Sequence, residues 1–438
     1  MKTVARILNN IRLGIFPIAY GLSGALIGGT LNRVMIAEME MPASLVGLFF
    51  AVPLLVSPAR VWFGYRSDGF MLFGKRREPY IVLGALLIGL GIMSIVTLSI
   101  NLAGSAVVLG IGVFIAFLIY GVGRNLGHNT FQALVADRFT GEAARGRAVT
   151  MYEVATLLGL IAGAGGLGKA LEHYDPAGLT QVAIGVAVIV LVLATFAAIA
   201  QEPRGEDVES AVENASKMPF KQVLEEVVLP DKQIRSFFIL VLFTFLGTLA
   251  QDVLLEPYGA LVLGMPVGET TRLTMYWGIG VMIAMLLSGT VLIKWLGYMK
   301  VMRAGMISSA LVFVALIVLG LSGNASAFKS IVFVMGLGTG MAGAGMLTGI
   351  ISFTTPIRAG MLMGVWGMAN MIGHALGSLI GGVIVDVVRN LLGGSAFAAY
   401  SSVFGMEVVM LMIALWLSTR LDMSASKAKL EAQEVMPA

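Results

Sequence analysis

The chain has 438 residues, 58% of them hydrophobic and only 12% charged, and its mean hydropathy is +0.90. Since soluble domains carry about 25% charged residues, this composition excludes a soluble globular protein and indicates one that crosses a membrane several times. The absence of cysteine excludes disulfides and thiolate metal sites, and the net charge of +4 suits an anionic lipid leaflet and requires no nucleic acid partner.

The chain begins with a basic, amphipathic stretch, MKTVARILNNIRLGIF, that has no small-residue cleavage site. We expect it to remain as an interfacial helix that leads into the first span. Twelve apolar runs follow, each long enough at about 20 residues to span a bilayer, and none has the period of two that barrel strands require. The sequence therefore predicts an all-α polytopic membrane protein with twelve transmembrane helices. The runs lie near residues 14–37, 44–65, 80–100, 105–135, 149–171, 180–200, 236–262, 272–294, 303–322, 328–352, 361–387 and 397–419.

Lysine and arginine are unevenly distributed between the loops. They are frequent before the first run and after each even-numbered run, whereas the alternate loops hold only Lys169, Arg272, Lys329 and Arg389. Because cytoplasmic loops carry the excess of basic residues, both termini are expected to be cytoplasmic. Within the membrane, Arg60 is expected to extend its long side chain toward the same face, and this route is also open to Arg124.

One long hydrophilic interruption separates six runs from six. We expect an N-terminal half at 1–200, a cytoplasmic linker at 201–235, a C-terminal half at 236–420 and a cytoplasmic tail at 421–438. The halves share a sequence echo, because the Gly-Thr-Leu triplets at 29–31 and 247–249 are 218 positions apart (247 minus 29), almost half of the chain. Two related six-span halves are the organisation of major facilitator transporters, and this fold is therefore expected.

A polar stripe interrupts the seventh run. Thr244, Thr248, Asp252 and Glu256 are four positions apart, so in a regular α-helix they share one face. An ionisable side chain at membrane depth costs several kcal/mol unless it is paired or faces a protein or water-filled interior. The stripe therefore predicts a functional site between helices.

The first run carries the corresponding segment, with Asn32 and Arg33 after its Gly-Thr-Leu triplet, where the seventh run has Gln251 and Asp252. Two carboxylates four positions apart repel each other, so either one keeps its proton or an arginine neutralises them. Because the first and seventh spans face each other in this architecture, we predict that Arg33 contacts Asp252 or Glu256 near a central cavity.

The loop after the second run reads GYRSDGFMLFGKRREP and resembles the cytoplasmic loop motif of the major facilitator superfamily, with a longer spacing between its acidic and basic parts. There a carboxylate beside a basic turn is expected to hold neighbouring helix ends; the alternative is an ordinary basic loop with one acid. The residues concerned are Gly64, Asp68, Gly74, Lys75, Arg76 and Arg77.

Four longer motifs resemble a more specific family. They are TLNRVMIAE at 30–38, the segment from Pro58 to Tyr80, GVGRNLGHNTFQALVAD at 121–137 and QDVLLEPYG at 251–259. Together they are similar to the bacteriochlorophyll delivery family, the PucC and LhaA type proteins of purple phototrophic bacteria, over nearly the whole chain.

The resemblance implies an assembly factor for light-harvesting complexes in the intracytoplasmic photosynthetic part of a bacterial inner membrane. Such a protein is expected to hold bacteriochlorophyll non-covalently, beside lipid, and to pass it to antenna polypeptides. The reaction centre core complex and pigment-synthesis enzymes are further expected partners. We expect no enzyme, because the sequence lacks an Asp-rich pair for a diphosphate and its Mg²⁺, a phosphate-binding Gly loop, and a nucleophile beside a base.

A neutral imidazole is a suitable axial ligand for the magnesium of a chlorin. His374, in a Gly-rich part of the eleventh run, and His128, in the fourth, are the ligand candidates, with hydrogen bonding between helices as the alternative for both. His173 is expected at the surface. No direct protein metal site is expected.

Two other functions stay open. A proton-coupled secondary transporter of a small solute would use Asp252 or Glu256 for proton exchange in a water-filled cavity. A scaffold without pigment would use all its membrane charges to lock helices together.

Overall fold

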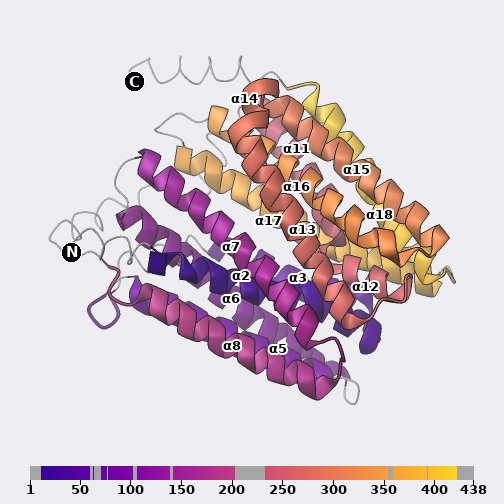
Figure 1. Cartoon of the computed structure of the whole chain (residues 1–438), viewed down its shortest axis with the longest axis horizontal. Helices are drawn as coiled ribbons and strands as arrows, with labels where there is room; N and C mark the ends of the chain where they lie inside the picture. Colours follow the sequence, from indigo (N-terminus) through magenta and orange to yellow (C-terminus); the bar gives the residue numbers. More distant parts are fainter. Residues whose placement is uncertain are drawn as a thin grey trace.

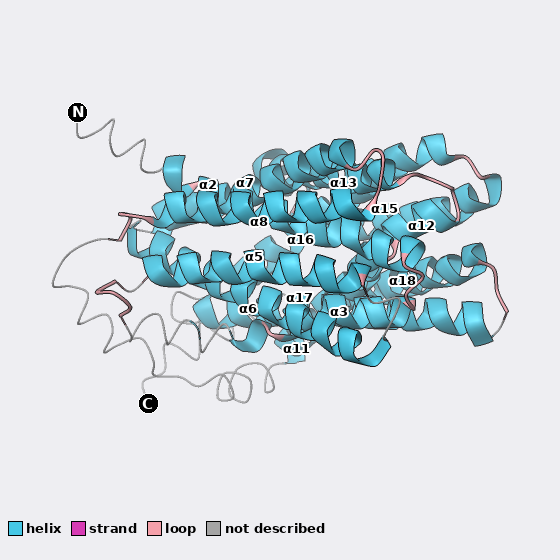
Figure 2. Ribbon diagram, turned by 90° about the horizontal axis from the view of Figure 1, so that it is seen from below, coloured by secondary structure: helices cyan, strands magenta, loops and turns pink. Residues whose placement is uncertain are grey.

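The computed structural model describes residues 11–59, 63, 71–75, 77–101, 106–138, 142–202, 232–353, 359–391 and 393–421. These residues are almost entirely helical (Figure 2), apart from loops and one isolated bridge between Leu72 and Lys75. The predicted all-α class is confirmed. Of the predicted linker only 201–202 and 232–235 are described, and of the predicted tail only Leu421, so the domain boundaries stay predictions.

Helices of the first half form the indigo-to-magenta part of Figure 1. They are α2 (Ile15–Leu26), η1 (Ile27–Leu31), η2 (Val34–Glu38), α3 (Ala43–Leu55), η3 (Ser57–Ala59), α5 (Glu78–Ile100), α6 (Ala106–Arg138), α7 (Glu142–Ala170) and α8 (Pro176–Ala198). Those of the second half, coloured pink to yellow, are α11 (Lys232–Leu249), η6 (Ala250–Val253), α12 (Leu255–Leu261), α13 (Val267–Leu287), η7 (Ser288–Leu292), α14 (Ile293–Leu296), α15 (Tyr298–Ser322), α16 (Ala325–Phe353), α17 (Ala359–Asp386), η8 (Val387–Leu391) and α18 (Ala396–Ser418).

Eleven helical segments of the described chain are long and apolar enough to cross a membrane, and a twelfth, Ala43–Ala59, is apolar but shorter. The twelve segments correspond to the twelve apolar runs, which supports the twelve-helix prediction. The second run is described only in part, because residues 60–62 and 64–65 lie outside the described ranges.

The two halves meet along two helix pairs, α3 with α17 and α7 with α13. Small residues allow this approach: a Cβ on Gly278 of α13 would lie 2.9 Å from the Ile161 side chain of α7. At the other pair, the Asp386 carboxylate accepts the backbone N–H groups of Ala43 and Ser44 at 2.9 and 2.8 Å. The last residue of α17 thereby caps the N-terminus of α3, where the helix dipole favours an anion.

The first span of each half is irregular at the repeated Gly-Thr-Leu triplet. In the first half the backbone is π-helical at 27–31 and 34–38, and in the second half a 3₁₀ turn at 250–253 follows α11. Non-helical backbone at membrane depth is tolerated where protein or a cavity surrounds it. The expected single polar stripe is therefore wrong: Thr244 and Thr248 are buried and bond to the carbonyls four residues earlier, whereas Asp252 lies beyond the break.

Candidate functional site

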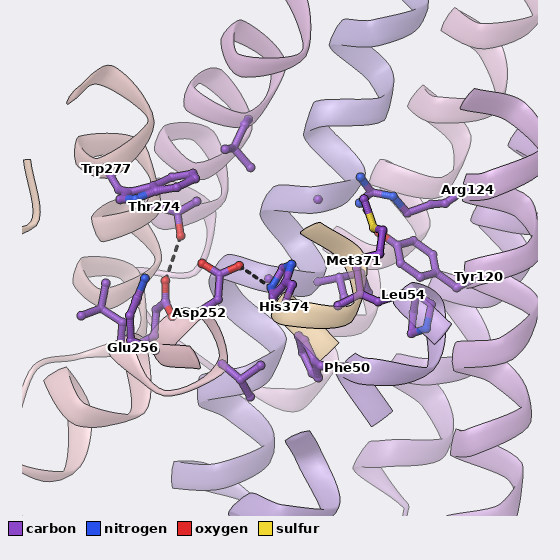
Figure 3. Close-up of a pocket in the computed structure, with 18 of the residues that line it drawn as sticks. Phe50, Leu54, Tyr120, Arg124, Asp252, Glu256, Thr274, Trp277, Met371 and His374 are labelled. Atoms are coloured by element: carbon purple, nitrogen blue, oxygen red, sulfur yellow. Dashed lines mark hydrogen bonds and ion pairs between the residues drawn. The ribbon is translucent and has the colours of Figure 1, made fainter. Parts of the chain in front are cut away.

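A cavity of about 330 Å³ lies between the two halves. Its walls come from α2, η1, α3, α6 and α7 of the first half and from η6, α12, α13, α16 and α17 of the second. Figure 3 shows Arg124 on one side and Asp252 and Glu256 on the other, with aromatic and methionine side chains between them. Three of the charged residues that the sequence places in the membrane, Arg124, Asp252 and Glu256, thus line one cavity.

Asp252 and His374 form a pair in this cavity. His374 Nε2 lies 3.0 Å from Asp252 Oδ2, and the two side chains are 23% and 39% exposed. The 3₁₀ turn carries Asp252 out of the register of α11, and glycines bring α17 close to that turn, since a Cβ on Gly377 would lie 3.0 Å from the Cα of Ala250. Among the described residues His374 Nδ1 has no hydrogen-bond partner.

Glu256 is buried, with 3% of its surface exposed. Asn32 Nδ2 donates to Glu256 Oε2 at 2.8 Å, and Thr274 Oγ1 lies 2.9 Å from Glu256 Oε1. The same Asn32 amide also approaches the carbonyl oxygens of Asp252 and Val253, at 3.3 Å each, which the 3₁₀ turn leaves without regular α-helical bonds. Asn32 therefore bonds the first span to the irregular part of the seventh.

The predicted contact of Arg33 with Asp252 or Glu256 is wrong in this structure. Arg33 forms an ion pair with Glu38, and its other terminal nitrogen donates to the carbonyl of Met265 at 3.2 Å. The reason is local: in a π-helix, residues five apart lie one above the other, so the π-helical backbone at 34–38 brings Glu38 next to Arg33.

Gln251, also a predicted site residue, is hydrogen-bonded to Glu407, a glutamate that the sequence analysis did not identify. Its backbone N–H donates to Glu407 Oε1 at 2.8 Å, and its side-chain amide donates to Thr248 O at 3.2 Å. Glu407 of α18 is fully buried, and its Oε2 has no partner within the described part of the chain. The sequence contained the signal, because Glu407 is the one acidic residue of the last apolar run.

Arg124 lies on the first-half wall of the cavity. Its guanidinium carbon is 4.0 Å from the ring centroid of Tyr20, and Nη1 donates to Tyr120 Oη at 2.8 Å. A Cβ on Gly24 would lie 3.3 Å from the same Nη1, so the glycine leaves room for the guanidinium. Arg60 lies outside the described residues.

The two candidate histidines are not brought together. His128 Nδ1 bonds with the Tyr152 hydroxyl, and its ring packs between Tyr20 and Tyr152 with centroid separations of 5.4 and 5.1 Å. His128 thus links α6 to α7, as the hydrogen-bonding alternative expects, and only His374 lines the cavity. The described residues include no group of three His, Asp or Glu side chains that could hold a metal ion.

The cytoplasmic loop motif is described only in part, since Gly64, Asp68 and Arg76 lie outside the described residues. Gly74 has a φ of +71°, a conformation that suits glycine. Lys75 pairs with Glu78, which also accepts the backbone N–H groups of Gln201 and Glu202 at 2.9 and 3.0 Å, and Arg77 N donates to Glu202 Oε1 at 3.2 Å. Glu78 is thus a carboxylate beside the basic turn that bonds to the chain following α8, and the role of Asp68 stays a prediction.

Solved structures with the same architecture are transporters. The nucleoside transporter NupG superposes with a TM-score of 0.70 at 11% identity, over 93% of this chain and 98% of that one. A D-xylose-proton symporter gives a TM-score of 0.67 at 15% identity, over 92% and 97% of the two chains. At these identities the likeness concerns the fold alone, which is that of the major facilitator superfamily.

Similar sequences come from purple bacteria. An uncharacterized protein of Rhodobacter capsulatus, encoded in the puhA-bchM intergenic region, is 32% identical over 91% of this chain and 84% of that protein. Protein PucC of the same organism is 31% identical over 92% and 90%, and its bacteriochlorophyll synthase 44.5 kDa chain is 28% identical over 94% and 95%. Residues 30–426 match the family model described as PUCC protein. The chain therefore belongs to the PUCC protein family.

Proposed function

We propose that this protein is an assembly factor for the light-harvesting complexes of a purple phototrophic bacterium, and that it binds bacteriochlorophyll and delivers it to antenna polypeptides. The observation that carries the proposal is the family match over residues 30–426, together with relatives from Rhodobacter capsulatus. One of these relatives is named for bacteriochlorophyll. The protein would act in the intracytoplasmic membrane, with both termini in the cytoplasm and antenna or reaction centre core proteins as partners.

His374 supports pigment binding. Histidines that bind a metal ion usually donate their other ring N–H to a carboxylate, which fixes the tautomer and raises the basicity of the ligating nitrogen. Asp252 would play this part for His374, because its Oδ2 accepts from Nε2 and leaves Nδ1 as an electron-pair donor. When bound, the pigment would supply a magnesium ion, and His374 would be the residue that holds it.

The cavity sets a limit on how the pigment is held. Its volume of about 330 Å³ is at the low end of the range of about 300–1,000 Å³ in which drug-sized ligands are enclosed. It therefore fits part of a tailed tetrapyrrole and not the whole molecule. Binding, not catalysis, suits the polar groups of this cavity, since they bond to one another: Asp252 with His374, and Glu256 with Asn32 and Thr274.

The test is the absorption spectrum of the protein after gentle purification from a pigment-producing host. We expect stoichiometric chlorin bands that are lost in His374→Ala and kept in His173→Ala. The second variant is a matched control, because His173 lies on the loop between α7 and α8 and does not line the cavity. Wild-type protein that carries neither pigment nor antenna polypeptides would contradict the proposal.

A proton-coupled transporter is the second candidate, and one observation favours it: carboxyl groups line a cavity between the halves of a transporter fold. In proteoliposomes, a solute gradient would then drive proton uptake, and Glu256→Gln would abolish the uptake while leaving solute binding measurable. A screen in which no small polar solute drives proton movement would contradict the transporter function.

A further inference from the structure

Arg124 lines the cavity and has no acidic partner among the described residues. Asp252 is paired with His374, and Glu256 receives hydrogen bonds from Asn32 and Thr274. No carboxylate of the described residues lies within the 4.0 Å of an ion pair from Arg124. Its neighbours are two tyrosines, whose rings lie 4.0 and 5.7 Å from the guanidinium carbon.

This arrangement is expensive in a membrane protein. A guanidinium stays charged and has five N–H donors in a planar fork, and a charge at membrane depth is costly unless it is paired or hydrated. The Tyr20 ring offsets part of this cost through a cation–π contact, and Tyr120 takes one donor. The remaining donors belong to a side chain on the cavity wall, opposite Asp252 and Glu256 (Figure 3).

The rest of the cavity wall favours a ligand with an apolar body. Figure 3 shows Phe50, Leu54 and Met371 between Arg124 and the acidic side, and Trp277 beside Thr274 on the acidic side. Aromatic and methionine side chains pack well against an irregular apolar molecule. The carboxyl groups of the opposite wall disfavour a second negative charge on the same molecule.

We propose that the cavity binds an amphipathic monocarboxylate. Its carboxylate takes two donors of Arg124 in the bidentate geometry that a guanidinium favours, and its apolar body lies against Phe50, Trp277 and Met371. This inference goes beyond pigment ligation, because it assigns a second kind of ligand to the wall opposite His374. Variants of Arg124 test this inference, whereas variants of His374 test pigment binding.

The experiment uses the full-length chain in lipid nanodiscs and isothermal titration calorimetry with 2-naphthoate as the probe. The matched neutral probe is 2-naphthamide, which has the same ring system without the charge. We expect saturable binding of the acid and at least about tenfold weaker binding of the amide, since a hydrogen-bonded charge contributes about 1.5–3 kcal/mol. Arg124→Gln should weaken naphthoate binding to the same extent, and Arg124→Lys should lie between, because lysine keeps the charge and loses the fork.

Two further variants separate the site from general effects. Arg272→Gln changes an arginine at the α7–α13 contact, where it approaches Gly168 O and Glu172, and it should leave the affinity unchanged. Gly28→Leu places a large side chain on the cavity lining, where a Cβ meets no atom within 4 Å, and it should abolish binding of both probes. The proposal is overturned if wild type shows no saturable binding of naphthoate, if acid and amide bind equally, or if folded Arg124→Lys and Gly28→Leu proteins bind like wild type.

Discussion

The first spans of the two halves carry related sequences and use them differently. In the first half, the segment after Gly29-Thr30-Leu31 is π-helical, and its charges close on each other as the Arg33–Glu38 ion pair. In the second half, the segment after Gly247-Thr248-Leu249 makes a 3₁₀ turn, and its acids bond to other helices, Asp252 to His374 of α17 and Glu256 to Thr274 of α13.

The difference separates a segment that supports its counterpart from a segment that lines the cavity. The first-half segment contributes Asn32, which satisfies the backbone and side chain of its counterpart, and it keeps its own charges away from the cavity lining. The second-half segment exposes Asp252 to the cavity and depends on neighbours for stability. Substitutions of those neighbours should therefore cost more than substitutions inside the Arg33–Glu38 pair.

The largest effect is expected at Glu407, which supports the 3₁₀ turn from α18. Glu407→Ala removes the acceptor of the Gln251 N–H and leaves a hole at a fully buried position. Losing a buried side chain and orphaning a buried donor should lower the free energy of unfolding by about 2–5 kcal/mol. Denaturing-detergent titration of the purified protein measures it.

Glu407→Gln is the matched control. Its amide oxygen can replace Oε1 as the acceptor, so stability should stay within about 1 kcal/mol of wild type. If the alanine and glutamine variants unfold alike, Glu407 does not support the turn through its hydrogen bond.

A smaller loss is expected for Asn32→Ala. The substitution takes the amide donor from Glu256 Oε2 and from two backbone carbonyls. A buried acceptor that loses its partner costs about 1–3 kcal/mol, and the same titration measures it. Asn101→Ala removes an exposed amide that bonds to Thr97 O and should change stability by less than about 0.5 kcal/mol. Equal effects at both positions would mean that Asn32 does not hold the two first spans together.

Much of this architecture could be predicted from hydropathy and repetition. Apolar runs predict membrane spans because a helix needs about 20 apolar residues to cross the bilayer, and the repeated Gly-Thr-Leu triplet identified the two segments that face each other. Asp252 and Glu256 could be assigned to an interior site because lipid excludes them. The same rule applies to Glu407, which could also have been assigned to the protein interior from the sequence.

The partners of those charges could not be predicted, because they depend on helix type and on distant helices. The Arg33 prediction assumed a regular α-helix. In the π-helix at 34–38, residues five positions apart are neighbours, so Glu38 lies next to Arg33 and pairs with it. Tyr120 lies one turn before Arg124 and shares its face, so that contact was within reach of sequence reasoning. The Tyr20 ring comes from α2, and no spacing in the sequence indicates that Arg124 packs on it.

The smallest and most discriminating effect concerns Arg33 itself. A double-mutant cycle with Arg33→Met and Glu38→Gln should give a coupling energy of about 0.5–3 kcal/mol, because the two side chains form a direct, partly buried ion pair. The cycle of Arg33→Met with Glu256→Gln should be additive within about 0.5 kcal/mol, because the partners of Glu256 are Asn32 and Thr274. The reverse result, strong coupling to Glu256 and none to Glu38, would mean that the arginine crosses between the halves and that the first-half segment is not self-contained. Since both cycles share Arg33→Met, any general loss of packing from that substitution cancels in the comparison.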